Sequence, residues 1–162
     1  MRVEAPIKVD RKTKKLAKRL STGDIAVINH TDIDEVAANS LVECKIKLVI
    51  NAAPSISGRY PNKGPKILID NNILIIDNVG EKVFEDLKEG QIIEVNNGLI
   101  YRDGQLIGQG EVMDKSVVEQ KTKIAYENMS VELDRFIDNT IEYAKREKGF
   151  ILGETEIPKM AT

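Results

Sequence analysis

The sequence predicts an α/β domain with a mixed sheet, β-hairpins and a long C-terminal helix, and three observations lead to this prediction. Short apolar segments alternate with helical segments between residues 21 and 90, which is typical of β-α-β units with parallel strands. Asn-Gly and Asp-Gly turns at 97–98 and 103–104 then separate alternating strands, as in antiparallel hairpins. About thirty-five residues without proline or glycine follow between 113 and 148, with helical periodicity.

The elements of the first part follow one another closely along the chain. In order, the sequence predicts a turn at 21–24, a strand at 25–30, a helix at 31–45, a strand at 46–50, a short helix at 66–72, a strand at 73–77 and a helix at 79–90. Thr31 or Asp32 is available as the N-cap of the helix at 31–45. The apolar character of the strand at 46–50 is expected for a central, parallel strand.

The long predicted helix carries one apolar face. Its members recur at helical spacing and are Val118, Ala125, Met129, Leu133, Phe136, Ile137, Thr140, Ile141 and Ala144. A helix of this length cannot be covered by the small domain alone. We therefore expect its far half to meet another domain or a second copy of the chain, as in a homo-oligomer built on residues 114–148.

The composition is that of a cytoplasmic globular protein. Hydrophobic residues make up 41% of the 162 residues and charged residues 31%. No apolar stretch approaches the roughly 20 residues of a membrane span, and the N-terminus lacks the apolar core of a signal peptide. The single cysteine, Cys44, has no internal disulfide partner, which fits a reducing compartment, and its apolar flanks favour a buried structural role.

Positive charge is concentrated at the N-terminus. Residues 1–20 hold eight basic and two acidic side chains, a net charge of +6, which leaves −8 for the remainder. Such an arm could meet nucleic acid or an anionic membrane surface, or it could form a solvated helix that docks through Leu16, Ala17 and Leu20. We do not expect nucleic-acid binding, because no aromatic side chain is interleaved with these charges for base stacking.

The loop at 51–65, NAAPSISGRYPNKGP, is the strongest candidate for a ligand site. It leaves the carboxyl end of a predicted strand, where open α/β sheets bind ligands. Loops longer than about 12 to 15 residues in compact domains are usually functional or disordered, and this one is rich in rigid residues. The residues that could supply N–H groups, hydroxyls and cations to a phosphate-like anion are Ser55, Ser57, Gly58, Arg59, Tyr60, Asn62, Lys63 and Gly64.

This loop does not have the spacing of known nucleotide-binding motifs. It contains no G-x-x-x-x-G-K-[ST] sequence, because Lys63 and Gly64 are followed by Pro65, and it contains no dinucleotide fingerprint. In the structural alternative, the prolines stiffen the loop over the end of the sheet, while Arg59 and Tyr60 pack on a neighbouring segment.

A second cluster, NHTDIDE at 29–35, combines His30 with three acidic residues. This mixture of side chains is found in metal sites. Capping explains it better, because acidic residues are expected at the start of a helix from the helix dipole alone. No metal ligands and no histidine-dependent catalytic pair are therefore expected.

The order of elements resembles the swivelling phosphohistidine domain of phosphoenolpyruvate-utilising enzymes. The segments that carry this resemblance are GDIAVINHTDIDE and NNILIIDNVGEKVFEDLKEGQIIEVNNGLIY. The resemblance implies a swivelling β/β/α-type domain. In that family a G-G-x-T-S-H loop carries the phosphorylated histidine, whereas SGRYPNKG places Lys63 near that position. An ammonium ion has no free lone pair for a phosphoryl group, so phosphocarrier chemistry is not expected.

Nearly the whole chain also resembles the N-terminal region of SteA-like proteins, which are bacterial cytokinetic-ring proteins. The matching segments are KRLSTGDIAVINHTDIDEVAANSL, the loop at 51–65, ILIIDNVG and NTIEYAKRE. In that family a thiamin pyrophosphokinase-like domain and then a hydrophobic anchor follow. The resemblance implies a role in cell separation with a protein partner of the division machinery, and membrane attachment only through a C-terminal segment missing here.

Together these features predict a basic arm (1–20), a swivelling-like α/β domain (21–112), a long helix (113–148) and a linker (149–162) to a domain absent from this chain. We expect a non-catalytic regulatory or ligand-binding module with the loop as its site. No cofactor is expected in this chain, although the missing domain could bind a nucleotide. One alternative is a thiamin pyrophosphokinase-like enzyme in which Arg59 and Lys63 hold a phosphate; another is a dimerisation unit.

Overall fold

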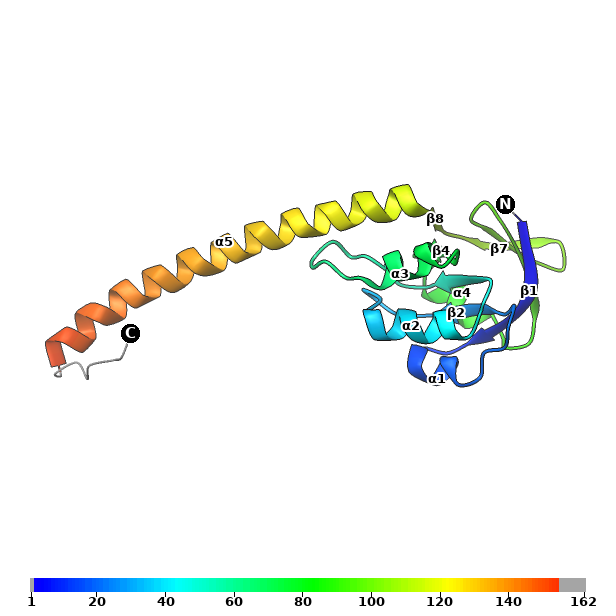
Figure 1. The fold of residues 1–162 in the computed structure, drawn as a ribbon, viewed down its shortest axis with the longest axis horizontal. Coiled ribbons are helices and arrows are strands. Elements are labelled where there is room, and N and C mark those ends of the chain that lie inside the picture. Colours follow the sequence, from blue (N-terminus) through cyan, green and yellow to red (C-terminus); the bar gives the residue numbers. More distant parts are fainter. Residues whose placement is uncertain (1, 155–162) are drawn as a thin grey trace.

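A computed structural model describes residues 2–154 as an α/β domain followed by a long helix (Figure 1). The elements in chain order are β1 (Arg2–Val9), α1 (Thr13–Ala17), β2 (Ile25–Ile28), α2 (Glu35–Glu43), β3 (Leu48–Asn51), α3 (Gly64–Asp70), β4 (Leu74–Asp77), α4 (Glu81–Asp86), β5 (Ile92–Asn96), β6 (Leu99–Arg102), β7 (Gln105–Gln109), β8 (Glu111–Met113) and α5 (Lys115–Glu154). The strands form one mixed sheet in the order β7-β6-β5-β1-β2-β3-β4-β8. The predicted α/β class with a mixed sheet, hairpins and a long C-terminal helix is confirmed.

The parallel half of the sheet consists of β1, β2, β3 and β4, with a helix in each connection. Every residue of β2 and β3 is buried, as the apolar sequences of these strands predict. Because the strands are parallel, the segments that follow them emerge at one edge of the sheet. This carboxyl edge is where the candidate site lies.

The antiparallel half is a meander of β5, β6 and β7 next to β1. Its two turns have positive φ angles at Asn97, Gly98, Asp103 and Gly104, which type I′ hairpin turns require. The two hairpins predicted from the Asn-Gly and Asp-Gly pairs are therefore confirmed. A short strand that the sequence did not predict, β8, pairs antiparallel with β4 at the opposite edge of the sheet.

β1 joins the two halves and differs from the basic arm predicted at residues 1–20. Arg2 to Pro6 pair antiparallel with β5, whereas Ile7 to Val9 pair parallel with β2. Pro6, which has no N–H group to donate, stands where the pairing changes from β5 to β2. Residues 2–9 are therefore a central strand, and the predicted domain boundary at residue 20 lies inside the folded unit.

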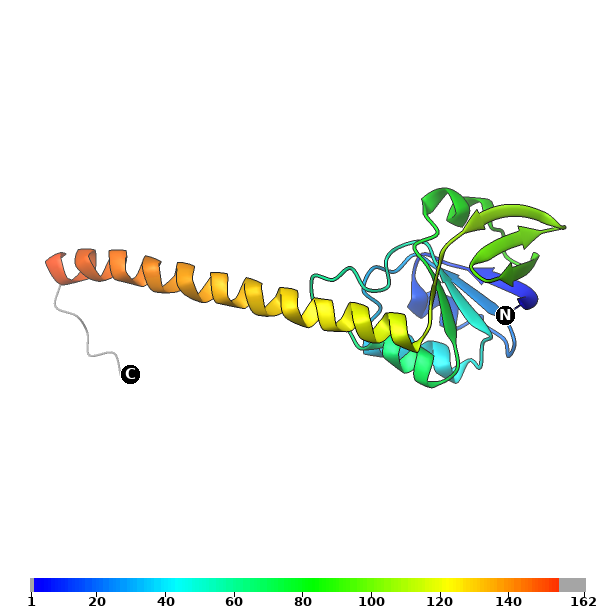
Figure 2. The ribbon, with the colours of Figure 1, turned by 90° about the horizontal axis from the view of Figure 1, so that it is seen from above.

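The sheet separates two hydrophobic cores, because neighbouring residues of a strand face opposite sides. Ile28 and Val49 belong to the core covered by α1, α2, α3 and the first turns of α5. Val27 and Ile50 belong to the core formed with Phe84 of α4 and the antiparallel strands. Figure 2 shows α4 and the antiparallel ribbon on one side of the sheet and α5 on the other. Burial of each such aliphatic side chain contributes about 1.5 to 3 kcal/mol.

Within the described residues, the long helix α5 packs against the domain near its start. Val118 and Ala125 are buried against the domain, after which the helix extends away from it (Figures 1 and 2). The helix continues to Glu154, beyond the predicted end at 148, and the rest of the predicted linker, residues 155–162, lies outside the described residues. Within residues 2–154, no helix is long and apolar enough to cross a membrane.

The N-cap of α2 differs from the prediction. Asp34, and not Thr31 or Asp32, caps the helix, with its Oδ1 atom accepting a hydrogen bond from the N–H of Ala37 at 2.7 Å. Asp32 instead has a φ of +55° and forms part of the turn before the helix. Because Asp32 does not cap the helix, its carboxylate is available to accept hydrogen bonds from the loop at 51–65.

Candidate functional site

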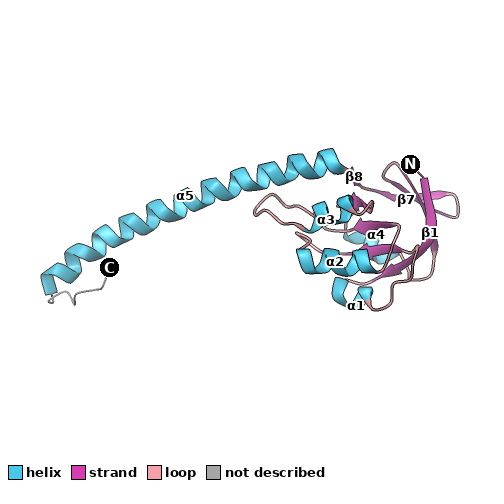
Figure 3. Ribbon diagram, in the orientation of Figure 1, coloured by secondary structure: helices cyan, strands magenta, loops and turns pink. Residues whose placement is uncertain are grey.

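The loop at 51–65 leaves β3 at the carboxyl edge of the sheet and approaches α5 (Figure 3). Asn51, the last residue of β3, is fully buried and holds the start of the loop. Its Oδ1 atom accepts from the N–H groups of His30 (3.0 Å) and Ala53 (3.1 Å). Its Nδ2 atom donates to the His30 carbonyl (2.9 Å) and to Ser55 Oγ (2.7 Å). One amide therefore ties β3, the segment after β2 and the loop together.

Ser55 connects the loop to the end of β4. Its N–H group donates to Oδ1 of Asp77 at 2.9 Å, and both residues are buried. Burial raises the pKa of Asp77, and the hydrogen bonds from the hydroxyl and N–H groups of Ser55 act in the opposite direction. The carboxylate thus serves as an internal acceptor for the loop backbone.

Asn62 and Gly64 hold the other end of the loop. Asn62 Nδ2 donates to the carbonyls of Ile33 (2.9 Å) and Ser55 (2.8 Å), so this amide offers no free donor to a ligand. A Cβ atom on Gly64 would lie 2.2 Å from the Ile33 carbonyl oxygen, which only glycine avoids. We refer to Asn51, Ser55, Asn62 and Gly64 as the loop base.

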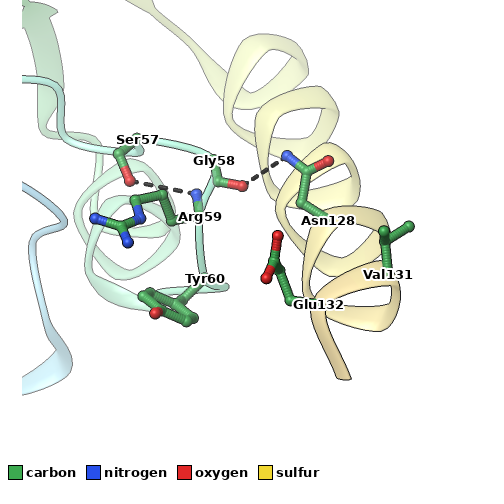
Figure 4. A pocket seen from close by; sticks show the side chains of 7 residues that line it. All are labelled: Ser57, Gly58, Arg59, Tyr60, Asn128, Val131 and Glu132. Carbon is green, nitrogen blue, oxygen red and sulfur yellow. Dashed lines mark hydrogen bonds between the residues drawn. The ribbon is translucent and has the colours of Figure 1, made fainter. Parts of the chain in front are cut away.

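Residues 57–60, which we call the loop tip, are held from two sides. The N–H and hydroxyl groups of Ser57 donate to the two carboxylate oxygens of Asp32 at 2.6 and 2.8 Å. On the other side, Nδ2 of Asn128 in α5 donates to the Gly58 carbonyl at 2.8 Å (Figure 4). The tip is therefore fixed between the turn before α2 and the long helix.

A hollow of about 370 Å³ lies between the loop tip and α5, lined by residues 57–60 together with Asn128, Val131 and Glu132. In Figure 4, Arg59 extends away from α5, whereas Glu132 points towards the loop. The Arg59 guanidinium lies 5.7 Å from the centre of the Tyr60 ring, within range of a cation–π interaction. The Tyr60 residue is 57% exposed.

The predicted site residues divide into two groups. Ser57, Gly58, Arg59 and Tyr60 surround the hollow, whereas Ser55, Asn62 and Gly64 belong to the loop base. Lys63 is exposed at the start of α3, and neither it nor Arg59 forms an ion pair with any described residue. The free polar groups are therefore side chains, while several backbone donors expected to bind an anion are engaged within the chain.

The sequence did not point to the partners of the loop. Asn128 and Glu132 belong to α5 and are brought to the tip only by the docking of that helix. Asp32 and Asp77 lie close to the ends of β2 and β4, and polar residues at the ends of apolar strands were the available signal. Because the order of the strands in the sheet was not known from the sequence, the position of Asp32 and Asp77 at strand ends did not identify them as partners of this loop.

The cluster at 29–35 does not form a metal site in the part of the chain described, where no group of three His, Cys, Asp or Glu side chains could hold an ion. Nδ1 of His30 is hydrogen-bonded to Oγ1 of Thr13 at 2.9 Å. Cys44 is half-buried, with its Sγ atom 3.3 Å from the carbonyl oxygens of Ala17 and Ser40, and burial raises the pKa of its thiol.

Comparison of the sequence with models of known protein families gave no match, and comparison with curated proteins gave none either. The fold and the loop geometry define an α/β domain that presents a structured loop beside a long helix.

Proposed function

We propose that the protein is a non-catalytic binding module whose loop tip, together with the adjoining turns of α5, recognises a protein partner. The observation that carries this proposal is the division of the loop. Its base uses polar groups to bind the chain itself, and its tip leaves the Arg59 and Tyr60 side chains exposed. Arginine and tyrosine are enriched among residues that dominate the energy of protein interfaces.

The tip has the properties of a pre-organised interface. Asp32 and Asn128 hold its backbone, so the tip would lose little conformational freedom on binding. Two charges of opposite sign, Arg59 and Glu132, border the hollow. Charges at the border of an interface mainly fix orientation and specificity, which suits recognition of one partner.

The resemblance to SteA-like proteins supports a role for this module in bacterial cell separation. It also supports a partner that belongs to the division machinery. The experiment replaces the chromosomal gene with an R59A/Y60A variant and measures the fraction of unseparated cells. We expect the fraction to rise towards that of a deletion strain, at unchanged protein level. Normal cell separation in the R59A/Y60A strain would contradict the proposal. The matched control is K82A, which changes an exposed lysine on α4.

Binding of a phosphate-like anion is the alternative that the same residues could support. A thermal-shift series with phosphate, phosphoenolpyruvate, ATP, GTP, thiamin and thiamin diphosphate tests it, with an R59A/K63A variant beside the parent chain. A ligand at 100 times its dissociation constant would add about 2.7 kcal/mol of stability. We expect no increase in melting temperature that depends on Arg59 or Lys63. An increase that is abolished in R59A/K63A would favour the anion site and an enzyme-linked role.

We infer a second function, self-association, from the exposed face of α5. Seven large apolar or aromatic side chains beyond the domain recur along one side: Tyr126, Met129, Leu133, Phe136, Ile137, Ile141 and Tyr143. Each is between 39% and 66% exposed, and an isolated helix gains little stability in water without packing. Their spacing of three and four residues is that of helices that pair in coiled coils.

Sedimentation equilibrium of the parent chain and of L133E/F136E tests this inference. We expect a concentration-dependent dimer for the parent chain and a monomer for the variant, because two carboxylates would have to be buried in the helix pair. R135E, on the opposite side of the helix, is the matched control and should still associate. A parent chain that stays monomeric at high micromolar concentration would overturn self-association.

A further inference from the structure

A second concave site lies between α1 and α2, at the carboxyl ends of β1 and β2. This groove has a volume of about 580 Å³ and is lined by residues 11–14 after β1, residues 29–31 after β2 and the first turns of α2. It shares no lining residue with the hollow at the loop tip. Its volume is within the range of pockets that hold small organic ligands, about 300 to 1,000 Å³.

The groove combines positive charge with an apolar side. Lys12 and Lys14 line it, and both are exposed and form no hydrogen bond or ion pair through their ammonium groups with any described residue. On the α2 side, Val36 is 76% exposed. An apolar side chain left so exposed beside two unpaired cations suits a ligand with an apolar body and an anionic group.

The other charges of the groove are already engaged. Arg11 forms an ion pair with Glu81 and lies 4.9 Å from the centre of the Phe84 ring, which directs its guanidinium towards α4. The one acidic lining residue, Asp34, accepts the N–H of Ala37 as the cap of α2. The two lysines are therefore the cations available to a ligand, and together they match a charge of about −2.

His30 adds an oriented polar group. Its Nδ1 atom is hydrogen-bonded to the buried Thr13 at 2.9 Å, which fixes the ring between the segments that follow β1 and β2. Nε2 forms no hydrogen bond with any described residue. In the tautomer in which Thr13 donates to Nδ1, the Nε2 proton is available to an acceptor oxygen of a ligand.

We propose that this groove binds a small phosphate monoester that carries an apolar group, with the phosphate held by Lys12 and Lys14 and the apolar group against Val36. A phosphate monoester at neutral pH carries nearly two negative charges and can satisfy both lysines, whereas a carboxylate can neutralise only one. The position at the carboxyl edge of parallel strands is where open α/β folds bind such ligands.

Calorimetric titration with phenyl phosphate tests the proposal. Inorganic phosphate and phenol, which correspond to the two parts of phenyl phosphate, are titrated separately for comparison. We expect phenyl phosphate to bind more tightly than either part. K12Q/K14Q should weaken its binding at least about tenfold, the loss expected when a charge-assisted contact is removed. K15Q/K18Q, which removes two exposed lysines of the same segment outside the groove, should leave the affinity unchanged.

V36N separates the apolar contribution from the charge contribution. It should weaken phenyl phosphate binding about fivefold and leave the response to inorganic phosphate unaltered, because only the apolar contact is lost. No heat of binding with phenyl phosphate at millimolar concentration would overturn the proposal. An equal loss in K12Q/K14Q and K15Q/K18Q would also overturn it, since the binding would then be unspecific attraction to the basic segment.

Discussion

The base and the tip of the loop at 51–65 both carry polar side chains, but those of the base bind the chain itself and those of the tip face solvent. At the base, Asn51 and Ser55 are fully buried, and their polar groups meet partners within the chain. At the tip, the Arg59 and Tyr60 side chains are exposed, while Asp32 holds Ser57 and Asn128 holds the Gly58 carbonyl. The difference shows that polar residues in a long loop identify a binding site only after the internal hydrogen bonds have been assigned.

The largest effect on stability is expected at the base, from N51A. The substitution removes four hydrogen bonds, two to N–H groups of His30 and Ala53, one to the His30 carbonyl and one to the buried Ser55. We expect the free energy of unfolding to fall by about 3 kcal/mol, measured by chemical denaturation. N51D keeps the shape but cannot donate to the His30 carbonyl, so it should also destabilise. A loss below about 1 kcal/mol for N51A would show that the base is not the anchor.

G64A tests the closeness of the backbone at the other end of the base. The added methyl group would meet the Ile33 carbonyl oxygen, and the loop or the turn before α2 would have to shift. We expect a loss of about 2 kcal/mol in the free energy of unfolding. Gly64 has no positive φ, so the loss in G64A reports the close contact, whereas G104A, with a φ of +77° and nothing within 4 Å of an added Cβ atom, gives the cost of backbone strain alone. A loss below about 0.5 kcal/mol in G64A would contradict the packing argument.

Asp77 gives the base a dependence on pH. Burial raises the pKa of its carboxyl group in the folded chain, so between the unfolded and folded values the folded state binds more protons. The free energy of unfolding should therefore fall as pH rises through that window, by no more than about 1.4 kcal/mol per pH unit. D77N removes this titration, so its stability relative to the parent chain should rise with pH there. If the difference in the free energy of unfolding between D77N and the parent chain did not change from pH 4 to pH 7, the pH dependence would not come from Asp77.

The smallest effect on stability is expected at the tip. R59A/Y60A removes one exposed cation–π contact and no buried group, so the free energy of unfolding should change by less than about 0.5 kcal/mol. The same denaturation experiment measures it. A loss as large as that of N51A would remove the distinction between base and tip.

Much of the fold could be predicted from the sequence, because apolar runs and hairpin turns are local signals. β1 was missed since its alternating Val3, Ala5, Ile7 and Val9 are interrupted by Pro6 and flanked by charges. The loop itself was correctly singled out as leaving the end of a parallel strand. Its internal partners were not predicted, because the contacts of Asn128 with the tip and Asp77 with Ser55 depend on the packing of distant segments.

The most direct test of the binding role is photo-crosslinking from the loop tip in living cells. A benzophenone amino acid replaces Tyr60 in the chromosomal gene, and a second strain carries it at Leu106, an exposed position on β7. The proposal predicts one defined protein adduct from position 60, identified by mass spectrometry, that is lost when Arg59 is changed to Ala and is absent from position 106. No adduct at position 60, or the same adducts from both positions, would contradict it.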